Sequence, residues 1–201
     1  MTIGIVGIGY VGLPLAVALA EEGQYVVAVD VDPRKVEALR AGRSYVEDVD
    51  SARLAAVSHR IEATTRYADL ARVEAILIAV PTPLTANREP DLGPLVDAAR
   101  SLAGVLQEGQ LVVLESTTYP GTTRERLVPL LEESGLAAGS DFQVAFSPER
   151  VDPGRTDHTL RTTPKVVGGL TEACLERAVS LYELVCDEVV AVSGPEPAEL
   201  S

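Results

Sequence analysis

Short apolar runs rich in β-branched residues alternate along the chain with segments whose apolar residues recur at helical spacing. The runs predict buried strands, and the recurrences predict amphipathic helices. The runs lack strict alternation of apolar and polar residues, which is typical of parallel strands that helices cover on both faces. The predicted strands occupy residues 3–7, 25–30, 75–80, 111–116, 142–147, 164–169 and 188–192.

The predicted helices fill the intervals between these strands. They cover residues 11–22, 33–41, 92–107, 122–134 and 171–186. Pro33 suits the first turn of its helix, and Gly42 and Gly135 stand just past two predicted ends. The alternation of strand and helix predicts an α/β fold with a doubly wound, mainly parallel sheet and helices on both faces. The least regular stretches are residues 42–59, 81–90 and 150–163.

The composition indicates one large globular domain with an acidic surface. A chain of 201 residues with 46% hydrophobic residues can bury a sizeable core. Its formal charge of −13 would repel a phosphate backbone, so we expect no nucleic-acid partner. No apolar stretch reaches the roughly 18 residues that span a bilayer, and Met1 leads into a strand pattern without a basic leader. These features predict a cytoplasmic protein without a membrane partner.

The cysteines and histidines lack the spacing of a metal site, and no metal is predicted. Cys174 and Cys186 form no CxxC pair and have no histidine close by in the sequence. We expect both thiols to be buried and structural, as free cysteines usually are. His59 and His158 are isolated in the sequence and are expected to be ordinary surface residues.

A glycine pattern follows the first predicted strand. Gly7, Gly9 and Gly12 form GxGxxG directly after residues 3–6 of that strand and directly before a helix, which is the context that a dinucleotide-binding turn requires. The first glycine permits the tight turn, the second lets the backbone approach a pyrophosphate, and the third lets the helix pack closely on the sheet. The positive end of the helix dipole would then face the anion.

Asp30, at the end of the second predicted strand, supports the same interpretation. An acid at this position of a dinucleotide-binding turn hydrogen-bonds the ribose hydroxyls of the adenosine. A carboxylate about 4 Å from a 2′-phosphate would repel it by about 4 kcal/mol per charge at an effective dielectric near 20. We therefore predict NAD rather than NADP, although the charges of Arg34 and Lys35 would weaken this preference.

Polar segments also follow three later strands. They are "VPTP" at 80–83, "ESTTYPGTT" at 115–123 and "SPER" at 147–150. Ligands of open α/β sheets bind beyond the carboxyl ends of the strands, so these loops should share one cleft. Each has an alternative explanation when taken singly: Thr82 as a turn hydroxyl, the Ser-Thr run as helix caps, and Glu149 as a surface acid beside Arg150. Taken together on one edge, they favour a functional site.

Six segments resemble a known family in their amino-acid sequences and in their order along the chain. They are "GIVGIGYVGLPLAVALA", "DVDPRKVEALRAG", "VPTPL", "ESTTYPGTT", "SPERVDPG" and "PKVVGG". This order resembles the UDP-glucose/GDP-mannose dehydrogenase superfamily, and the last two segments are most similar to its UDP-N-acetylhexosamine 6-dehydrogenase branch. The resemblance covers almost the whole chain and implies a Rossmann-type fold. It also implies a UDP-sugar substrate, whose C6 hydroxyl is oxidised to a carboxylate with two NAD through a cysteine thioester.

The matching positions of this chain take their roles from the resemblance. The pyrophosphate would be held by Gly7, Gly9, Tyr10, Val11 and Gly12. Asp30 would bind the ribose, with Lys35 and Thr82 as further cofactor contacts. Thr117 would contact the cofactor and orient a water near the reacting carbon. Glu149 would act as a general base on water during thioester hydrolysis, and Arg150 is a candidate substrate contact.

One departure from the family pattern concerns a second acid. UDP-glucose members carry another Glu four residues after the "SPE" acid, whereas this chain has Pro153 there and Asp152 one place earlier. The role of the second acid is therefore not carried over. The sequence also leaves open which UDP-N-acetylhexosamine is the substrate.

The resemblance implies that the chain consists of one domain and the beginning of a connecting helix. Residues 1–194 are expected to form the NAD-binding domain, and residues 195–201 to begin the connecting helix of the family. The family's Lys, Asn and nucleophilic Cys and its UDP site follow later, and neither Cys174 nor Cys186 matches that nucleophile. We therefore expect this chain to bind NAD without completing the oxidation, and the full-length enzyme to be a homodimer or larger. Two alternatives remain: another NAD-dependent dehydrogenase domain, or a non-catalytic NAD-binding module.

Overall fold

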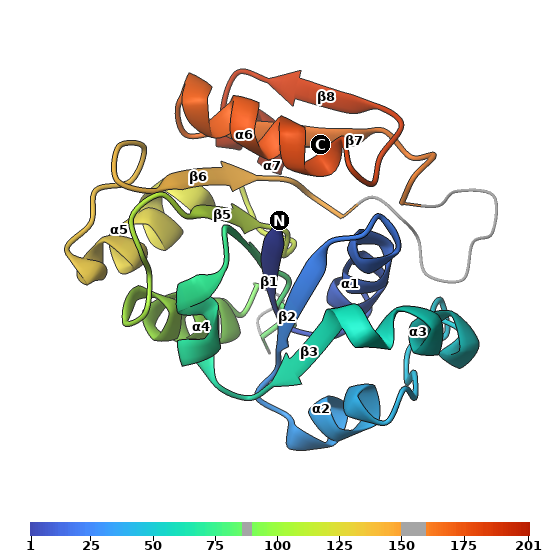
Figure 1. The fold of residues 1–201 in the computed structure, drawn as a ribbon. Coiled ribbons are helices and arrows are strands. Elements are labelled where there is room, and N and C mark those ends of the chain that lie inside the picture. Colours follow the sequence, from blue (N-terminus) through green and yellow to red (C-terminus); the bar gives the residue numbers. More distant parts are fainter. Residues whose placement is uncertain (86–89, 150–159) are drawn as a thin grey trace.

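A single sheet forms the centre of the molecule. The computed structural model describes residues 1–85, 90–149 and 160–201, and within them the sheet has eight strands in the order β3-β2-β1-β4-β5-β6-β7-β8 (Figure 1). The strands are β1 (Thr2–Val6), β2 (Tyr25–Val29), β3 (Ile61–Thr64), β4 (Ala75–Ile78), β5 (Leu111–Leu114), β6 (Gln143–Phe146), β7 (Lys165–Gly169) and β8 (Val189–Val192).

Helices cover both faces of this sheet. They are α1 (Gly12–Glu21), α2 (Pro33–Arg40), α3 (Ser51–Val57), α4 (Gly93–Ala103), α5 (Val128–Leu131), α6 (Glu172–Tyr182) and α7 (Pro195–Glu199). Buried residues of α1, α2, α3 and α6 form one core cluster with alternate strand residues such as Ile5 and Leu77. Buried residues of α4, α5 and α7 form a second cluster with the intervening strand residues, such as Val6 and Ile78. Figure 1 shows α4 and α5 on the left of the strands and α1 on the right, and the predicted doubly wound fold is confirmed.

The direction of the strands decides which segments meet at one edge. Neighbouring strands from β3 to β6 pair in parallel, as do β7 and β8, whereas β6 and β7 pair antiparallel. The beginning of β7 therefore lies on the same edge as the carboxyl ends of β1 to β6. The strand order also reverses between β1 and β4, which makes that position the topological switch point of the sheet.

Three elements differ from the pattern-based prediction. Ile61–Thr64 forms edge strand β3, which the apolar pattern missed because the strand is short and its Glu62 is exposed. Part of the stretch expected to be irregular forms α3, whose start is capped by the side chain of Asp50. The predicted helix at 122–134 consists of a π-helical turn at Thr123–Leu127, then α5 and a 3₁₀ turn. Pro129 lacks an N–H group, which accounts for an interruption of regular helix bonding there.

Within the described ranges, no helix has both the length and the apolar character needed to cross a membrane.

Candidate functional site

The structure gives a different reason for glycine at each of the three positions of the first turn. Gly7 has φ 92°, and a Cβ atom there would lie 2.5 Å from the carbonyl oxygen of Ala79. A Cβ atom on Gly12 would collide with the carbonyl oxygen of Gly7. Gly9 differs, because a Cβ atom there would meet no atom within 4 Å. The fold itself therefore requires Gly7 and Gly12, whereas Gly9 faces open space through which a ligand can approach the backbone at the start of α1.

Asp30 points into this turn from the end of β2. Its side chain is buried, and Oδ2 accepts hydrogen bonds from the amide of Ile8 at 2.8 Å and from Nζ of Lys35 at 2.9 Å. Oδ1 accepts a bond from the amide of Asp32 at 2.9 Å. A carboxylate oxygen accepts about two bonds, so Oδ1 keeps a position that suits a ribose hydroxyl. The predicted position of Asp30 beside the glycine turn is confirmed.

The charges around Asp30 are matched in pairs. Arg34 binds Asp32 through two nitrogens, and these hydrogen bonds lower the pKa of Asp32 to about 2. Lys35 binds Asp30, as described above. Each of these two cations therefore faces a carboxylate, which reduces the attraction that they would offer to a 2′-phosphate. Tyr10 and Val31 are the most exposed apolar side chains beside the turn, with 65% and 81% of their surface accessible.

Tyr45 is a supporting residue that the sequence did not single out. Its hydroxyl donates a hydrogen bond of 2.8 Å to the carbonyl oxygen of Ile8 within the glycine turn. Burial, followed by the charges of Asp30 and Asp32, raises the pKa of Tyr45, so the hydroxyl stays protonated and remains a donor. The segment at 42–59, whose position was open from the sequence, thus packs against the turn. This contact joins residues 37 positions apart, so no local sequence pattern predicts it.

The loops after β4 and β5 are tied together and supported from within. Ser116 Oγ donates a bond of 2.8 Å to the carbonyl oxygen of Val80, which links the ends of the two strands. The buried carboxylate of Glu199 in α7 accepts bonds from the amides of Gly121 and Thr123 at 2.6 and 2.7 Å. Thr117 lies between these two anchors and is exposed at the edge.

Two further threonines belong to the same edge. Thr82 follows β4 and is half-buried. The Oγ1 atom of Thr118 is buried and has no hydrogen-bond partner among the described residues. A polar atom left without a partner in this way fits a position where a ligand group would bind.

Glu149 follows β6 and reaches the same edge. Its side chain is 19% exposed, and Oε2 lies 3.9 Å from Nζ of Lys165. Lys165 is buried and also forms an ion pair of 2.7 Å with Glu115 at the end of β5. Sequence reasoning missed this buried pair, because its members are fifty positions apart. The predicted contact Arg150, with Asp152, Pro153 and His158, lies outside the described residues.

The candidate residues line one edge of the sheet. Gly9 follows β1, Asp30 follows β2, Thr82 follows β4, Thr117 follows β5 and Glu149 follows β6. Neighbouring strands lie about 4.8 Å apart, so the step from β1 to β6 spans about 14 Å. The edge can therefore hold one end of an extended ligand at β1 and β2 and place its other end beside β5 and β6. The structure places these five predicted residues along this one edge.

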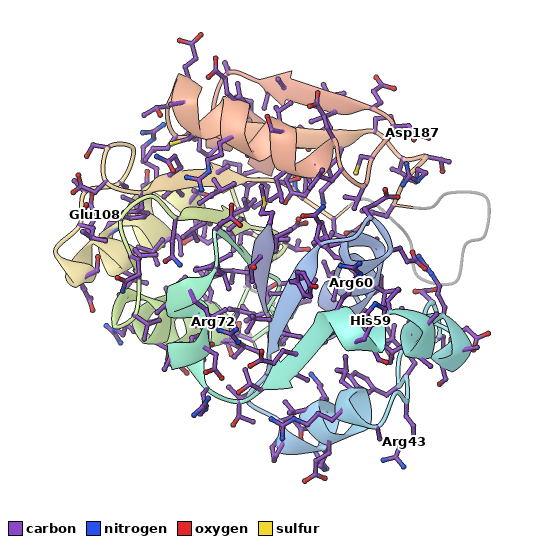
Figure 2. The ribbon with its side chains drawn as sticks, viewed as in Figure 1. Arg43, His59, Arg60, Arg72, Glu108 and Asp187 are labelled. Carbon is purple, nitrogen blue, oxygen red and sulfur yellow. The ribbon has the colours of Figure 1, made fainter. Side chains whose placement is uncertain are left out.

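The remaining titratable residues show no such arrangement. Cys174 and Cys186 are free and buried, as predicted, and burial raises the pKa of Cys186 to about 11. No group of His, Cys, Asp and Glu side chains in the described ranges could hold a metal ion. Figure 2 shows His59 beside Arg60 at the molecular surface, and His59 is exposed as predicted.

A glycine turn that opens onto a helix N-terminus, with a buried acid at the next strand end, is the mark of a Rossmann-class dinucleotide-binding domain when it stands at the switch point. Residues 1–186 match the family described as "UDP-glucose/GDP-mannose dehydrogenase family, NAD binding domain". The chain belongs to this family, and its cofactor is NAD. The resemblance seen in the sequence motifs is confirmed.

Individual relatives support the same assignment. The chain is 40% identical over 183 residues to the UDP-N-acetyl-D-glucosamine 6-dehydrogenase of Pseudomonas aeruginosa, a match that covers 90% of this chain and 43% of the relative. It is 35% identical over 209 residues to the UDP-N-acetyl-D-mannosamine dehydrogenase of Escherichia coli K12, a match that covers 99% and 49%. The NDP-N-acetyl-D-galactosaminuronic acid dehydrogenase structure from Methanosarcina mazei Go1 superposes with a TM-score of 0.93 at 34% identity, covering 99% of this chain and 45% of that one. The chain thus spans about half the length of these relatives.

Proposed function

We propose that this chain supplies the NAD-binding half of a nucleotide-sugar 6-dehydrogenase that acts on a UDP-N-acetylhexosamine. The relatives described above are named for UDP-N-acetylglucosamine, UDP-N-acetylmannosamine and a nucleotide-linked N-acetylgalactosaminuronic acid. The observation that carries the proposal is the placement of Glu149 on the same strand-end edge as the glycine turn and Asp30. One edge would then hold both the dinucleotide and a carboxylate able to act on water.

NAD would lie across the strand ends and accept hydride from the sugar carbon. The backbone at Gly9 and the start of α1 would hold the pyrophosphate, together with Gly7, Tyr10, Val11 and Gly12. Asp30 would bind the ribose through Oδ1, with Lys35 beside it. Thr82 and Thr117 would contact the other half of the cofactor. The open space at Gly9 and the unpartnered hydroxyl of Thr118 both fit such a ligand.

Glu149 would act as the general base on water, which requires a carboxylate fixed within reach of the reacting carbon. Thr117 is exposed between two anchored segments and would help to orient that water. Arg150 would contact the substrate. Residues 1–194 would form the cofactor domain and residues 195–201 the beginning of a connecting helix, with the nucleophilic cysteine and the UDP site supplied elsewhere in the protein. The whole enzyme would be a cytoplasmic homodimer or larger and would serve polysaccharide biosynthesis.

Calorimetric titration of the 201-residue chain with NAD tests the first half of the proposal. We expect saturable binding of NAD, and no NADH production when a UDP-N-acetylhexosamine is added to this chain alone. Both cysteines here are buried, so neither is placed to trap an aldehyde. UDP-sugar-dependent turnover by the 201-residue chain would contradict the assignment of the nucleophile to another part of the protein.

The protein expressed from its complete reading frame tests the second half. We expect NADH formation with at least one of UDP-N-acetylglucosamine, UDP-N-acetylmannosamine and UDP-N-acetylgalactosamine, at two NADH per sugar. Competition among the three sugars then identifies the substrate. A protein that binds NAD and oxidises none of the three, or UDP-glucose alone, would contradict the proposed substrate class.

A further inference from the structure

A buried charged cluster stands directly behind Glu149. It consists of Glu115 at the end of β5, Lys165 at the start of β7 and Tyr182 at the end of α6. Nζ of Lys165 donates a hydrogen bond of 2.7 Å to Oε2 of Glu115, and the hydroxyl of Tyr182 donates to Oε1. The side chains of Lys165 and Glu115 are 3% and 0% exposed. Nothing in the proposed chemistry uses this cluster directly.

Stability alone does not account for an ion pair at this position. Removing two charges from water costs several kcal/mol per ion, and well-packed apolar residues of similar volume often serve a fold at least as well. The surrounding core is apolar, with Val113, Ala145 and Val167 all buried on the face that α6 covers. A charged pair retained in such surroundings is a candidate for a role in the adjacent site.

The strand register aligns Lys165 with Glu149. Phe146 of β6 pairs with Gly168 of β7, and Ala145 pairs with Gly169. Continuing this antiparallel register past the end of β6 brings Glu149 level with Lys165. Ser147 fixes the register between these points, because its Oγ donates a bond of 2.8 Å to the carbonyl oxygen of Val166.

The three donors of the Lys165 ammonium have three neighbours. The first is Glu115, as described above. The second is the carbonyl oxygen of Pro148, which accepts a bond of 3.0 Å from Nζ. The third is Oε2 of Glu149, which lies 3.9 Å away and forms an ion pair with Nζ at a distance too long for a hydrogen bond. Lys165 therefore contacts both the backbone just before Glu149 and the carboxylate itself.

Burial opposes the charges of this cluster, and the members of the cluster offset that effect to different extents. Burial raises the pKa of Glu115, although the charge of Lys165 acts in the opposite direction. Burial works to lower the pKa of Lys165, but the carboxylates of Glu115 and Glu149 outweigh it and raise that pKa above the ordinary value. Burial also raises the pKa of Tyr182 well above its ordinary value, with Glu115 acting in the same direction. The ammonium thus stays charged and the phenol stays a donor at neutral pH.

We propose that Lys165 is a positioning residue that fixes the carboxylate of Glu149 at the strand-end edge, and that Glu115 and Tyr182 anchor the ammonium from inside the core. This inference rests on the proposed function, in which Glu149 is the general base. Lys165 acts through Glu149 and does not itself touch the reacting atoms. Its role is to hold a flexible side chain in one orientation, which a loop residue cannot do alone.

A double-mutant cycle on the complete protein tests the proposal. Glu115→Gln with Lys165→Met removes both buried charges together, so that neither is left unpaired. This pair of substitutions is expected to lower kcat by about 10- to 100-fold and to leave the KM for NAD within about twofold, because the loss affects the orientation of a general base and spares the cofactor site. In a Glu149→Gln background, the same pair should lower kcat by less than about threefold, because Lys165 then has no base to orient.

Arg177→Met provides the matched control. Arg177 is another cation of the chain, but it lies on α6 and bonds the carbonyl oxygens of Gly109 and Glu74 at the opposite edge of the sheet. We expect this variant to keep kcat within about twofold.

The outcomes separate the two proposals. Two results would overturn the role of Lys165 and leave the role of Glu149 intact. One is an unchanged kcat in the Glu115→Gln/Lys165→Met variant, here called the charge-removed protein. The other is an equal loss of kcat from these two substitutions in the wild-type and Glu149→Gln backgrounds. If Glu149→Gln itself leaves turnover unchanged, the proposed general base is wrong, and the role of Lys165 falls with it. Should the charge-removed protein fail to fold, Tyr182→Phe replaces it. This variant deletes only the anchoring hydroxyl, and the same background dependence, with a smaller loss, is required of it.

Discussion

The two ends of the strand-end edge are built by different means. At β1 and β2 the site consists mainly of backbone: a glycine turn, the start of a helix, and one acid whose partners lie within the neighbouring turns. At β5, β6 and β7 the carboxylates of Glu115 and Glu149, from separate parts of the chain, meet at the buried ammonium of Lys165. Both ends lie on the same edge of the sheet.

This difference predicts different sensitivities. Gly9 faces open space, so a side chain there should spoil a ligand site while sparing the fold. Lys165 is enclosed, so its loss should damage the fold and the site together. The first end separates binding from stability, and the second end couples them.

The largest effect should follow Lys165→Met in the 201-residue chain. The carboxylate of Glu115 would then be buried without its cation, which should lower the free energy of unfolding by about 3–5 kcal/mol. Urea unfolding measures the change. Adding Glu115→Gln should restore most of the loss, and a double variant no more stable than Lys165→Met would show that the pairing argument is wrong.

Gly9→Val should break the other end without this cost. The new side chain would occupy the space where, under the proposed function, a pyrophosphate approaches the backbone, so we expect NAD affinity to fall by about 100-fold or more. Calorimetry measures the affinity, and the urea midpoint should stay close to that of the wild type. Gly104→Val is the matched control, because Gly104 is exposed and its nearest neighbour to a Cβ atom is 3.7 Å away. Unchanged affinity in Gly9→Val would mean that the pyrophosphate is misplaced.

The choice between NAD and NADP sharpens the account of the first end. Asp30 pairs with Lys35 and Asp32 pairs with Arg34, so a 2′-phosphate beside Asp30 would meet a carboxylate, and these two cations would already be paired. We expect NADP to bind at least about tenfold more weakly than NAD. Parallel titrations in low salt are the measurement. Equal affinities would rule out the electrostatic argument built on Asp30.

The smallest effect concerns Cys186, which lies close to the buried cluster. Its pKa is raised from 9.0 to about 11, so the native state holds the thiol proton more tightly than the unfolded chain does. The resulting stability is complete below pH 9 and is lost as the pH rises toward 11. Between pH 8 and pH 10 this loss amounts to about 1 kcal/mol.

Cys186→Ser carries no group that titrates in this range. Its free energy of unfolding, measured in urea at several pH values, should therefore fall less steeply between pH 8 and pH 10 than that of the wild type. Identical slopes for the two proteins would exclude the thiol as a source of the pH dependence.

Much of the fold could be predicted because its signals are local. The buried strands read as continuous apolar runs, and Pro33 marked the start of α2. The edge strand β3 was not predicted, because Glu62 interrupts a short apolar run. The strand is stabilised by its pairing with β2, which a local pattern does not show. The helix α3 was not predicted, because it is short and its N-cap residue Asp50 stands among other polar residues.

The part of the candidate site at β1 and β2 could be predicted from the sequence, whereas the part at β5 to β7 could be predicted only incompletely. The glycine turn and Asp30 follow from spacing, because residues close in sequence must share one turn. Tyr45 and the pair of Glu115 and Lys165 do not, because their partners lie far along the chain. No propensity or period encodes such a contact.

The sequence by itself determined the alternation of strand and helix, the glycines that a dinucleotide turn requires, and the family through motifs in a fixed order. Each of these depends on interactions within a few residues or on a linear pattern. Only the tertiary structure decided that β7 runs antiparallel to β6 and thereby brings Lys165 between Glu115 and Glu149. The physical reason is that the burial of a charge is settled by everything packed around it, and that environment exists only once the sheet and its covering helices have assembled.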